Sequence, residues 1–316
     1  IGILAAFEWT AFDMPAVAGI AGLLAWLPVC WIVLPRAWPG RAVAWVAVLA
    51  LLTYVPASPT ARCAEVRILD VGQGLAVLVQ TRSTALLYDT GPAYRGGGSA
   101  AEQLIVPLLS RLRVNRLDQL VVTHGDDDHA GGVTAILAGV SVAELLVGEP
   151  LNGIDAPQRR CHSNMRWSAD GIEFRFLHPE PGSSLQGNDA SCVLLISAGQ
   201  QRLLLTGDIE RAAEARLVER ATLDGIDIVT VPHHGSRTSS TLAFVATLRP
   251  EIAIVANGFG NRWGLPKPDI VARWQGTGAR LLQTAESGAI RVHFCSDSST
   301  ISVRRHRAAR HRIWHE

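Results

Sequence analysis

Lysine is almost missing from this sequence of 316 residues, which contains Lys267 and no other. Arginine therefore carries nearly all of the positive charge, and the formal net charge is only +1 at pH 7. A nearly neutral chain excludes overall positive charge as the means of holding a polyanion, so any such contact depends on local clusters. The sequence begins with Ile1 and lacks an initiating methionine, so we expect a fragment of a longer protein.

Long apolar runs without charge are concentrated at the beginning of the sequence. Residues 17–34 form one such run, which as a helix would span about 27 Å, close to the thickness of a bilayer core. A second run, residues 42–55, would span about 21 Å and would be marginal alone. The basic stretch and the cleavage site of a signal peptide are both missing. We therefore predict two transmembrane helices, with a buried helical hairpin of a soluble domain as the alternative.

The short loop between the two runs contains Arg36 and Arg41 and no acidic residue. Short loops with this charge stay in the cytoplasm, so both outer ends of the predicted hairpin face the other side of the membrane. Residues 56–60 contain two prolines and form an exit linker. We expect three parts: a membrane segment with about two transmembrane helices at 1–60, a folded domain at 61–300, and a basic, disordered tail at 301–316.

Two histidines and three aspartates crowd into one turn at residues 124–129. An apolar run at 117–122, typical of a buried strand, precedes the turn, and residues 133–137 favour the start of a helix. Packing does not explain the cluster, because like charges repel and each charge costs free energy to desolvate. A multivalent cation does explain it, since carboxylate and imidazole groups are its usual ligands. A solvated acidic turn with incidental histidines is the simpler alternative.

Polar side chains also stand beside four other strand-like runs. They are Asp89 after 85–88, Asn188 before 192–196, Asp208 after 202–205, and His233 and His234 after 226–231. Polar groups at successive strand ends are the expected pattern for a site above the edge of a sheet. This pattern favours one metal site over a solvated turn.

These segments resemble the metallo-β-lactamase superfamily, whose His-x-His-x-Asp-His motif appears at 124–129 with Asp126 in place of the second histidine. More narrowly, residues 71–74, 188–191, 206–210 and 233–240 resemble the C-terminal domain of the ComEC family. Members of that family are inner-membrane channels through which competent bacteria take up single-stranded DNA. The resemblance runs from about residue 65 to about residue 292. One departure is Leu265, which stands where the family usually has a histidine.

The resemblance implies a role for each of these positions. The implied metal ligands are His124, Asp126, Asp128, His129, Asp208 and His234. Catalytic roles are implied for Asp128, Asp208 and His234. The residues implied to support the ligands or to contact substrate are Asp89, Asn188, His233, Ser236, Arg237 and Asn261.

Within this set, the resemblance distributes the ligands over two metal ions. His124 and Asp126, with Asn188 as an optional third group, would face one ion. Asp128, His129 and His234 would face the second ion, and Asp208 would bridge both. Asp89 would orient a ligand histidine from behind, and His233 is the alternative to His234.

Two of these positions favour hard metal ions. Asp126 replaces a histidine and Asn188 stands where a histidine is common, and both substitute oxygen for nitrogen, which favours Mn²⁺ or Mg²⁺ over Zn²⁺. We expect one or two divalent ions, with Mn²⁺ preferred. A two-metal site activates water near neutral pH and stabilises in-line displacement at phosphorus, so phosphodiester hydrolysis is the predicted reaction. Hydrolysis of β-lactams is disfavoured, because it relies on sites rich in nitrogen and sulfur.

The order of apolar runs predicts an α/β domain. Strands are expected at 66–69, 76–80, 84–88, 117–122, 172–177, 193–197, 202–206, 226–231, 252–255 and 290–294. Helices are expected at 101–112, after 132, and at 209–221, 240–248 and 269–274. Two sheets flanked by helices satisfy the layer rule. The resemblance sharpens this to a metallo-β-lactamase-like αββα four-layer sandwich, with the site where its halves meet.

The five cysteines fit an oxidising compartment outside the cytoplasm. Cys161 and Cys192 form the favoured disulfide pair, because a bridge between them would tether a long insertion to the sheet. Cys63 and Cys295 form a weaker second pair, and either could be a buried thiol. Cys30 lies in the first apolar run and has no predicted partner.

Contacts with DNA are expected from arginines. Arg237 and Arg262 lie near the site motifs and are suited to meeting phosphates. The basic run 304–312 suits DNA or anionic lipid head groups, and a solvated tail fits it equally well. The sequence shows no aromatic residues at the spacing of a base-stacking surface.

Three functions remain open. The leading one is an extracytoplasmic, metal-dependent nuclease domain of a ComEC-type protein in the inner (cytoplasmic) membrane, with DNA and other uptake components as partners. The second is a membrane-anchored hydrolase of a small phosphodiester or another ester. The third is a catalytically silent domain that binds DNA and gates the channel. Further membrane spans upstream would favour the first over the second, and nuclease turnover would favour it over the third.

Overall fold

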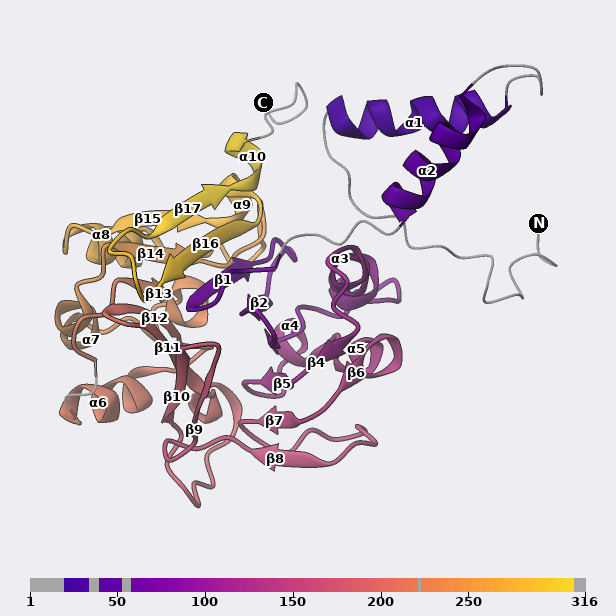
Figure 1. The fold of residues 1–316 in the computed structure, drawn as a ribbon. Helices are drawn as coiled ribbons and strands as arrows, with labels where there is room; N and C mark the ends of the chain where they lie inside the picture. Colours follow the sequence, from indigo (N-terminus) through magenta and orange to yellow (C-terminus); the bar gives the residue numbers. More distant parts are fainter. Residues whose placement is uncertain (1–19, 34–39, 53–57, 221–222, 310–316) are drawn as a thin grey trace. The chain divides into compact units, whose positions relative to one another are not determined.

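The computed structural model describes residues 20–33, 40–52, 58–220 and 223–309 (Figure 1). The chain divides into two compact units. The first comprises residues 1–57 and 107–115, and the second comprises residues 58–106 and 116–316. All of the predicted site residues belong to the second unit.

The first unit contains two apolar helices, α1 (Ile20–Val33) and α2 (Arg41–Leu52), which contact each other. Nη2 of Arg41 donates a hydrogen bond of 2.7 Å to the carbonyl oxygen of Ile32. Among the described residues, no helix reaches the length and apolar character that crossing a membrane requires. The predicted spans include residues 17–19, 34 and 53–55, which lie outside the described residues, so the transmembrane helices stay a prediction.

The second unit is built on two sheets, within the described residues 58–220 and 223–309. In chain order, the strands of the first sheet are β1 (Cys63–Ile68), β2 (Val77–Gln80), β3 (Ala85–Tyr88), β5 (Gln119–Val122), β7 (Leu145–Val147), β8 (Gln158–Arg160), β16 (Ile290–Cys295) and β17 (Ser302–Arg305). Their order across the sheet is β17-β16-β1-β2-β3-β5-β7-β8. The four strands from β3 to β8 run parallel. Their carboxyl ends therefore meet at one edge, where Asp89 and His124 follow β3 and β5.

The second sheet repeats this arrangement. In chain order, its strands are β9 (Arg166–Ala169), β10 (Ile172–His178), β11 (Val193–Ala198), β12 (Gln201–Leu205), β13 (Ile228–Thr230), β14 (Ile252–Val255) and β15 (Arg280–Gln283). They lie in the order β15-β14-β13-β12-β11-β10-β9, and β12 to β15 run parallel. Asp208 and His234 follow β12 and β13, so they too lie at a carboxyl edge. A small sheet pairs β4 (Arg116–Leu117) with β6 (Ser141–Val142).

A hydrophobic core fills the space between the two sheets. Val66 and Val79 of the first sheet and Phe176 and Leu194 of the second are buried in one cluster. Alternating apolar residues on facing strands produce this layer, since every second side chain points to the same side of a sheet. The Tyr88 hydroxyl adds a polar link, because it donates a hydrogen bond of 2.6 Å to the carbonyl oxygen of Cys192.

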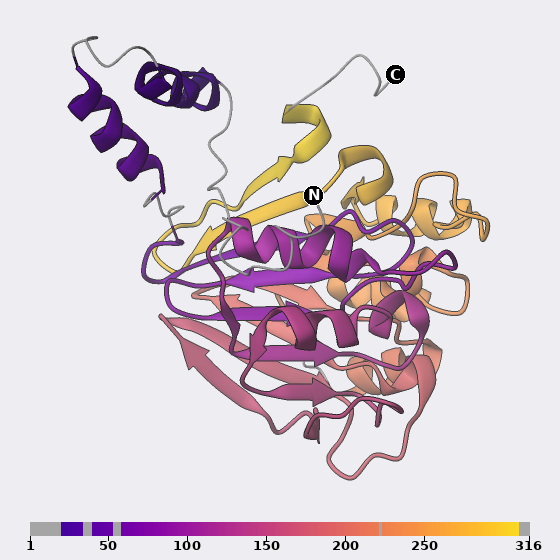
Figure 2. The ribbon, with the colours of Figure 1, turned by 90° about the vertical axis from the view of Figure 1, so that its right-hand side faces the viewer.

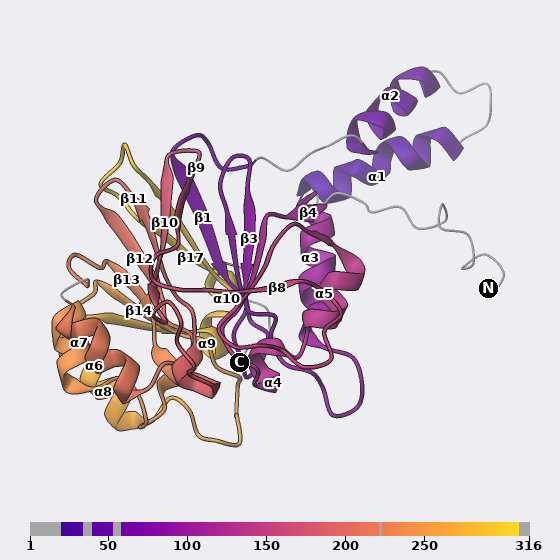
Figure 3. The ribbon, with the colours of Figure 1, turned by 90° about the horizontal axis from the view of Figure 1, so that it is seen from below.

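Helices cover the outer faces of both sheets (Figure 2, Figure 3). Most of α3 (Val106–Arg111) is assigned to the first unit. The helices and helical turns of the second unit, within the described residues, are η3 (Ala101–Ile105), α4 (Asp127–Ala130), α5 (Val133–Gly139), η4 (Gly187–Ala190), α6 (Arg211–Glu219), η5 (Pro232–Gly235), α7 (Leu242–Leu248), α8 (Pro268–Gln275), α9 (Thr284–Ser287) and α10 (His306–Ala309). Side chains of α6, α7 and α8, among them Leu217, Phe244 and Trp274, form a second core against the outer face of the second sheet. Figure 3 shows these helices on one side of the sheets and α4 and α5 on the other. The unit is thus a four-layer αββα sandwich.

The C-terminal segment differs from the expected disordered tail. Residues Ser302–Arg305 form β17, which pairs antiparallel with β16, and α10 follows directly. The prediction rested on the arginines of this segment, whereas Ile301 and Val303 pack against the central core. Arg307 then pairs with Asp70, with 2.6 Å between Nη2 and Oδ2. The folded domain therefore continues past residue 300, and residues 310–316 lie outside the described part.

Two disulfides tie the second unit together. Cys161 is bonded to Cys192, with 6.0 Å between their Cα atoms, which confirms the favoured pair. Cys63 is bonded to Cys295, the second predicted pair, and these residues stand opposite each other on β1 and β16. Cys30 is a free, exposed cysteine in α1.

Candidate metal centre

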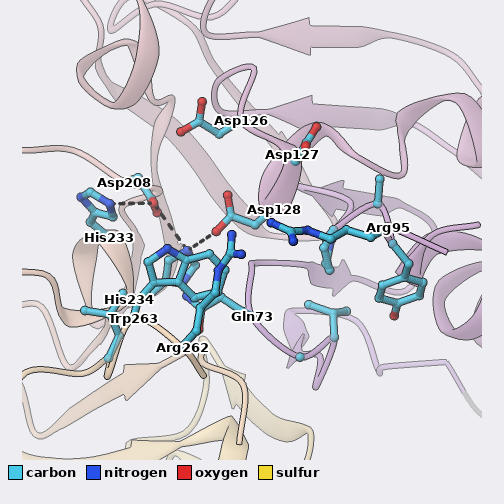
Figure 4. Close-up of a pocket in the computed structure, with 16 residues that line it drawn as sticks. Gln73, Arg95, Asp126, Asp127, Asp128, Asp208, His233, His234, Arg262 and Trp263 are labelled. Carbon is cyan, nitrogen blue, oxygen red and sulfur yellow. Dashed lines mark ion pairs between the residues drawn. The ribbon is translucent and has the colours of Figure 1, made fainter. Parts of the chain in front are cut away.

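A cavity of about 610 Å³ opens where the carboxyl edges of the two sheets meet (Figure 4). Acidic groups line one part of it: Asp126, Asp127, Asp128 and Asp208. His233, His234 and two arginines, Arg95 and Arg262, line other parts. The cavity therefore combines a carboxylate-rich floor with cationic side chains.

The acidic turn has a conformation fixed by its neighbours. Asp126 has extended backbone and precedes α4, whose four residues include Asp128 and the buried His129. Leu75 donates a backbone hydrogen bond of 3.1 Å to the carbonyl oxygen of Asp128. Gly74 has φ +134°, and a Cβ atom there would stand 2.3 Å from that same oxygen. The Val-Gly-Gln-Gly segment is thus a glycine-dependent support for the turn.

Two side chains of this turn, Asp128 and His129, converge with two side chains that follow strands of the second sheet, Asp208 and His234. Nε2 of His129 lies 3.2 Å from Oδ1 of Asp208 and 3.2 Å from Nε2 of His234. Nε2 of His234 lies 3.3 Å from Oδ2 of Asp128 and 3.5 Å from Oδ2 of Asp208. Figure 4 shows the carboxylates of Asp128 and Asp208 turned toward His234. Asp128 and His129 come from one turn, whereas Asp208 and His234 are far from that turn in the sequence, so only the folded domain brings the four side chains together.

Hydrogen bonds on the far side of each ring determine which nitrogen faces the cluster. Nδ1 of His234 donates to the carbonyl oxygen of Ala256 at 2.7 Å, because a carbonyl oxygen can only accept. Nδ1 of His129 donates to Oδ2 of Asp89 at 2.7 Å. Both rings therefore direct an unprotonated Nε2 atom toward the cluster when they are neutral.

His124 follows the same rule. The Thr123 hydroxyl donates its single proton to Asp89, at 2.9 Å, and so accepts from Nδ1 of His124, at 3.0 Å. Nε2 of His124 is buried and has no hydrogen-bond partner among the described residues. An orphaned ring nitrogen beside other converging ligand atoms is the feature a bound cation would satisfy.

Two groups of side chains have the proximity that a metal ion requires. The first is His124, His129 and Asp208, and the second is Asp128, His129 and His234, each with ligand atoms within 4.8 Å of one another. His129 belongs to both groups, whereas the resemblance gave it to one ion. Among the described residues, His234 joins a group and His233 does not, which favours His234 of the two alternatives. The donor set contains nitrogen and oxygen and fits a divalent cation.

Asp126 and Asn188 stand outside both groups. The Asp126 carboxylate is 64% exposed, and its Oδ2 lies 3.6 Å from Nε2 of His124, which is longer than a hydrogen bond. Asn188 instead donates from Nδ2 to Oε1 of Glu210 at 3.1 Å. Glu210 precedes α6 and holds the amide away from the cluster. Asp126 is therefore near the centre, whereas Asn188 belongs to neither candidate group and does not line the cavity.

The charges of the cluster favour a cation between the rings. Burial lowers the pKa of His129, but the Asp208 and Asp89 carboxylates outweigh burial and leave that pKa well above its usual value. Burial raises the pKa of Asp208, but His129 and His234 outweigh it and leave the pKa well below its usual value. Asp208 is thus held as an anion that needs a positive partner, either a proton on a ring or a metal ion in its place.

Asp89 makes the contacts that the implied supporting role requires. It is fully buried, and besides its contact with His129 it accepts hydrogen bonds from the backbone nitrogen of Thr123, at 2.7 Å, and from the Thr123 hydroxyl. The carboxylate thus fixes His129 directly and His124 through Thr123. Such contacts behind the ligands keep the rings in the correct tautomer and orientation.

His233 lies beside the centre with its own set of partners. Its Nδ1 atom is 3.2 Å from Oε1 of Glu210 and 3.0 Å from the Thr238 hydroxyl. Its Nε2 atom lies 3.9 Å from Oδ2 of Asp208, and the ring lines the cavity. The His233 ring therefore faces the cavity, next to the candidate ligands.

The remaining predicted residues have structural partners. Arg237 donates from Nε to both carboxylate oxygens of Asp269, at 2.9 and 3.1 Å, and Ser236 pairs with the Thr238 hydroxyl at 3.1 Å. Neither residue lines the cavity. The α8 carboxylate therefore engages the arginine that was expected to meet phosphates. Asn261 fixes its own loop through Leu265, which donates to Oδ1 at 2.9 Å.

Arg95 and Trp263 line the cavity but were not identified from the sequence. Arg95 stands in an exposed loop before three glycines, where an arginine has no distinctive pattern. Trp263 follows Arg262, which was predicted to meet phosphates. The position of Trp263 directly after that arginine was the one feature of the sequence that could have indicated its place at the cavity.

The domain is similar to several known proteins. A family model described as the metallo-beta-lactamase superfamily matches residues 69–258. Recombination protein 2 of Haemophilus influenzae is 36% identical over 241 residues, which are 76% of this chain and 30% of that protein. Competence protein ComA of Neisseria gonorrhoeae is 35% identical over 288 residues, which are 89% of this chain and 40% of that protein. The chain thus spans less than half the length of either relative.

A solved structure is similar as well. A mutant of the CmlA beta-hydroxylase matches with a TM-score of 0.50 and 16% identity, over 88% of this chain and 60% of that one. At this identity the likeness concerns the fold alone.

Proposed function

The chain belongs to the metallo-beta-lactamase superfamily and is related to ComEC-type competence proteins, and on that premise we propose that its second unit is a metal-dependent nuclease. The reaction is hydrolysis of phosphodiester bonds in DNA during uptake. The observation that carries the proposal is the convergence of three histidines, His124, His129 and His234, around the Asp208 carboxylate, with Nε2 of His129 and of His234 within 3.5 Å of it.

The residues present fit one or two divalent ions. His124, His129 and Asp208 would hold one ion, and Asp128, His129 and His234 would hold another. When the three rings are neutral, their unprotonated nitrogens and the carboxylate oxygens leave lone pairs facing one another, which a cation stabilises. When bound, such ions polarise a phosphoryl oxygen and activate water near neutral pH. Mn²⁺ is the proposed ion, because Asp126 stands beside His124 where the superfamily motif has a histidine, so the centre has one more carboxylate and one imidazole fewer in reach.

The charge of the cavity favours an anionic substrate more strongly when the cluster holds cations. Four aspartates line it against two arginines, so a phosphodiester would be repelled by the floor as it stands. With the floor neutralised, Arg95 and Arg262 are placed to bind phosphate oxygens from the sides of the cavity. Asp89 keeps His129 oriented throughout. The arrangement thus couples substrate binding to metal binding.

We also propose that the domain lies outside the cytoplasm, attached to the inner membrane. The two disulfides support this, because such bridges persist in oxidising compartments. Large apolar side chains are exposed on both helices of the first unit, including Trp26, Leu27, Trp45 and Val46. Exposed apolar surface of this kind favours contact with lipid or with further protein segments.

A reporter fusion tests this placement. Alkaline phosphatase fused after Thr60 is expected to be active, because Arg36 and Arg41 retain the preceding loop in the cytoplasm. A green fluorescent protein fused at the same point is expected to stay dark. Fluorescence from the second fusion would contradict the extracytoplasmic placement.

The nuclease proposal is tested with the purified 316-residue chain. Single- and double-stranded oligonucleotides and bis(p-nitrophenyl) phosphate are each incubated with Mn²⁺, Mg²⁺ or Zn²⁺, with a chelator as control. Cleavage of DNA with Mn²⁺, abolished by the chelator, is the expected result. Hydrolysis of the small diester alone would favour a small-molecule hydrolase. Metal binding without any turnover would favour a silent, DNA-binding domain.

A further inference from the structure

The loop between β14 and α8 carries an indole ring to the rim of the cavity. Trp263 and its neighbour Arg262 line the cavity together with Asp128 and Asp208. The Arg262 guanidinium lies over the indole, with Cζ 4.3 Å from the ring centroid. Figure 4 shows both side chains among the residues that line the cavity. One face of the ring is thus occupied by a cation.

Packing does not explain this position of the indole. Trp263 is 48% exposed, whereas Trp274, in the same half of the domain, is fully buried against Phe244. The exposed half of the indole is apolar surface at the mouth of the cavity, and a flat partner that covered it would gain free energy from its burial. The cavity that it borders is the one proposed to bind a phosphodiester.

The loop holds the ring in place before any ligand arrives. Asn261 donates from Nδ2 to the carbonyl oxygens of Gly258, at 3.0 Å, and Leu265, at 2.6 Å. Nζ of Lys267 donates to the carbonyl oxygen of Trp263 at 2.6 Å. Because these hydrogen bonds already fix the backbone of the loop, the ring loses little conformational freedom when it binds a flat partner.

We propose that Trp263 and Arg262 form a stacking subsite for an unpaired nucleobase of the DNA strand that enters the metal centre. Arg262 covers one face of the indole, and the base takes the other face. Indole and base stack well whatever the base, because every base has a π-face. Within a duplex, each base is already stacked on its neighbours, so the subsite selects single-stranded DNA. The inference rests on the proposed function and names its substrate class.

The test measures binding rather than cleavage, so it stands apart from the nuclease assay. A fluorescein-labelled six-nucleotide single strand is titrated with the 316-residue chain in a chelator at low salt, and binding is followed by anisotropy. The same strand with abasic sites in place of its nucleotides serves as the second ligand. Three variants are compared with the unsubstituted chain: Trp263→Ala, Trp263→Phe and Phe259→Ala. Phe259 is the matched control, because it is 90% exposed in the same loop but does not line the cavity.

Trp263→Ala is expected to weaken binding of the normal strand about 5- to 100-fold and to leave binding of the abasic strand unchanged. Trp263→Phe should recover most of the loss, because it keeps a ring, and Phe259→Ala should have no effect. Repulsion by the cavity's carboxylates acts equally on all variants in one buffer. Equal losses for both strands would overturn the inference, as would a full effect of Phe259→Ala. Failure of the unsubstituted chain to bind the normal strand, in chelator and with Mn²⁺ added, would overturn it too.

Discussion

Nε2 of His129 lies 3.2 Å from Oδ1 of Asp208, although His129 follows a strand of the first sheet and Asp208 follows a strand of the second. The contact therefore exists only when the two sheets have packed against each other. Fully buried His129 and nearly buried Asp208 are oppositely charged or share a cation. The metal centre is thus a direct consequence of the sandwich.

Asp89→Asn is expected to weaken Mn²⁺ binding about 10- to 100-fold, because the amide no longer holds Nδ1 of His129 as an anion does. Calorimetric titration of the metal-free chain measures the change. The control is Asp118→Asn, since Asp118 also accepts a backbone hydrogen bond next to β3, from Ala85 at 2.9 Å, but at the opposite end of that strand. Equal losses from both substitutions would show a general effect on the fold.

The pH dependence of stability is expected to include a contribution from His178. Burial lowers the pKa of His178, and its Nε2 donates to the carbonyl oxygen of Asp189 at 2.8 Å. The folded pKa lies below the unfolded value of 6.5, so the unfolded chain binds more protons between them. This contribution is fully present above pH 6.5 and is lost as the pH falls through the folded pKa.

His178→Gln isolates that contribution, because glutamine keeps a donor and does not titrate. The free energy of unfolding is measured by urea denaturation of both proteins at pH 8 and pH 5. The advantage of the unsubstituted chain over the variant should shrink at pH 5. An advantage that grows on acidification would show that folding raises the pKa of His178 instead of lowering it.

Loss of the Cys161–Cys192 bridge is expected to reduce the free energy of unfolding by about 3–4 kcal/mol, from the entropy of a loop with a sequence separation of 31. The double substitution to alanine, with urea denaturation, measures this. Hydrogen exchange should rise between residues 148 and 187 more than in β5 and β12, which carry the metal site. Faster exchange in β5 and β12 than in the insertion would contradict a local role for the bridge.

Much of the site was predictable because it depends on strand ends. Asp89, His124 and Asp208 each follow an apolar run, and parallel strands place their carboxyl ends at one edge. The sequence could not place side chains whose position depends on neighbouring loops. Asn188 was expected near a metal, but Glu210 from another segment holds its amide.

The fold shows the same division between strong and weak patterns. The long apolar strands of the core were predictable. Short strands such as β8 and β9 have polar sequences without an apolar pattern, and they form by pairing with the last strand of a sheet. The last strand, β17, was not predicted because two of its four residues are arginines. Trp263 lines the cavity because hydrogen bonds fix the conformation of its loop, and a hydrophobic pattern in the sequence does not predict such a conformation. Loops fixed by tertiary contacts are thus where the sequence was least informative.

The central claim is that Asp128 holds a metal ion on which DNA cleavage depends. Mn²⁺-dependent cleavage of single-stranded DNA by Asp128→Ala and Asp127→Ala tests it directly, with circular dichroism confirming that both proteins are folded. Asp127 is the matched control, because it stands in the same turn and lines the same cavity but belongs to neither candidate ligand group. Cleavage should be abolished by Asp128→Ala and largely retained by Asp127→Ala. Full activity of Asp128→Ala would contradict the metal mechanism.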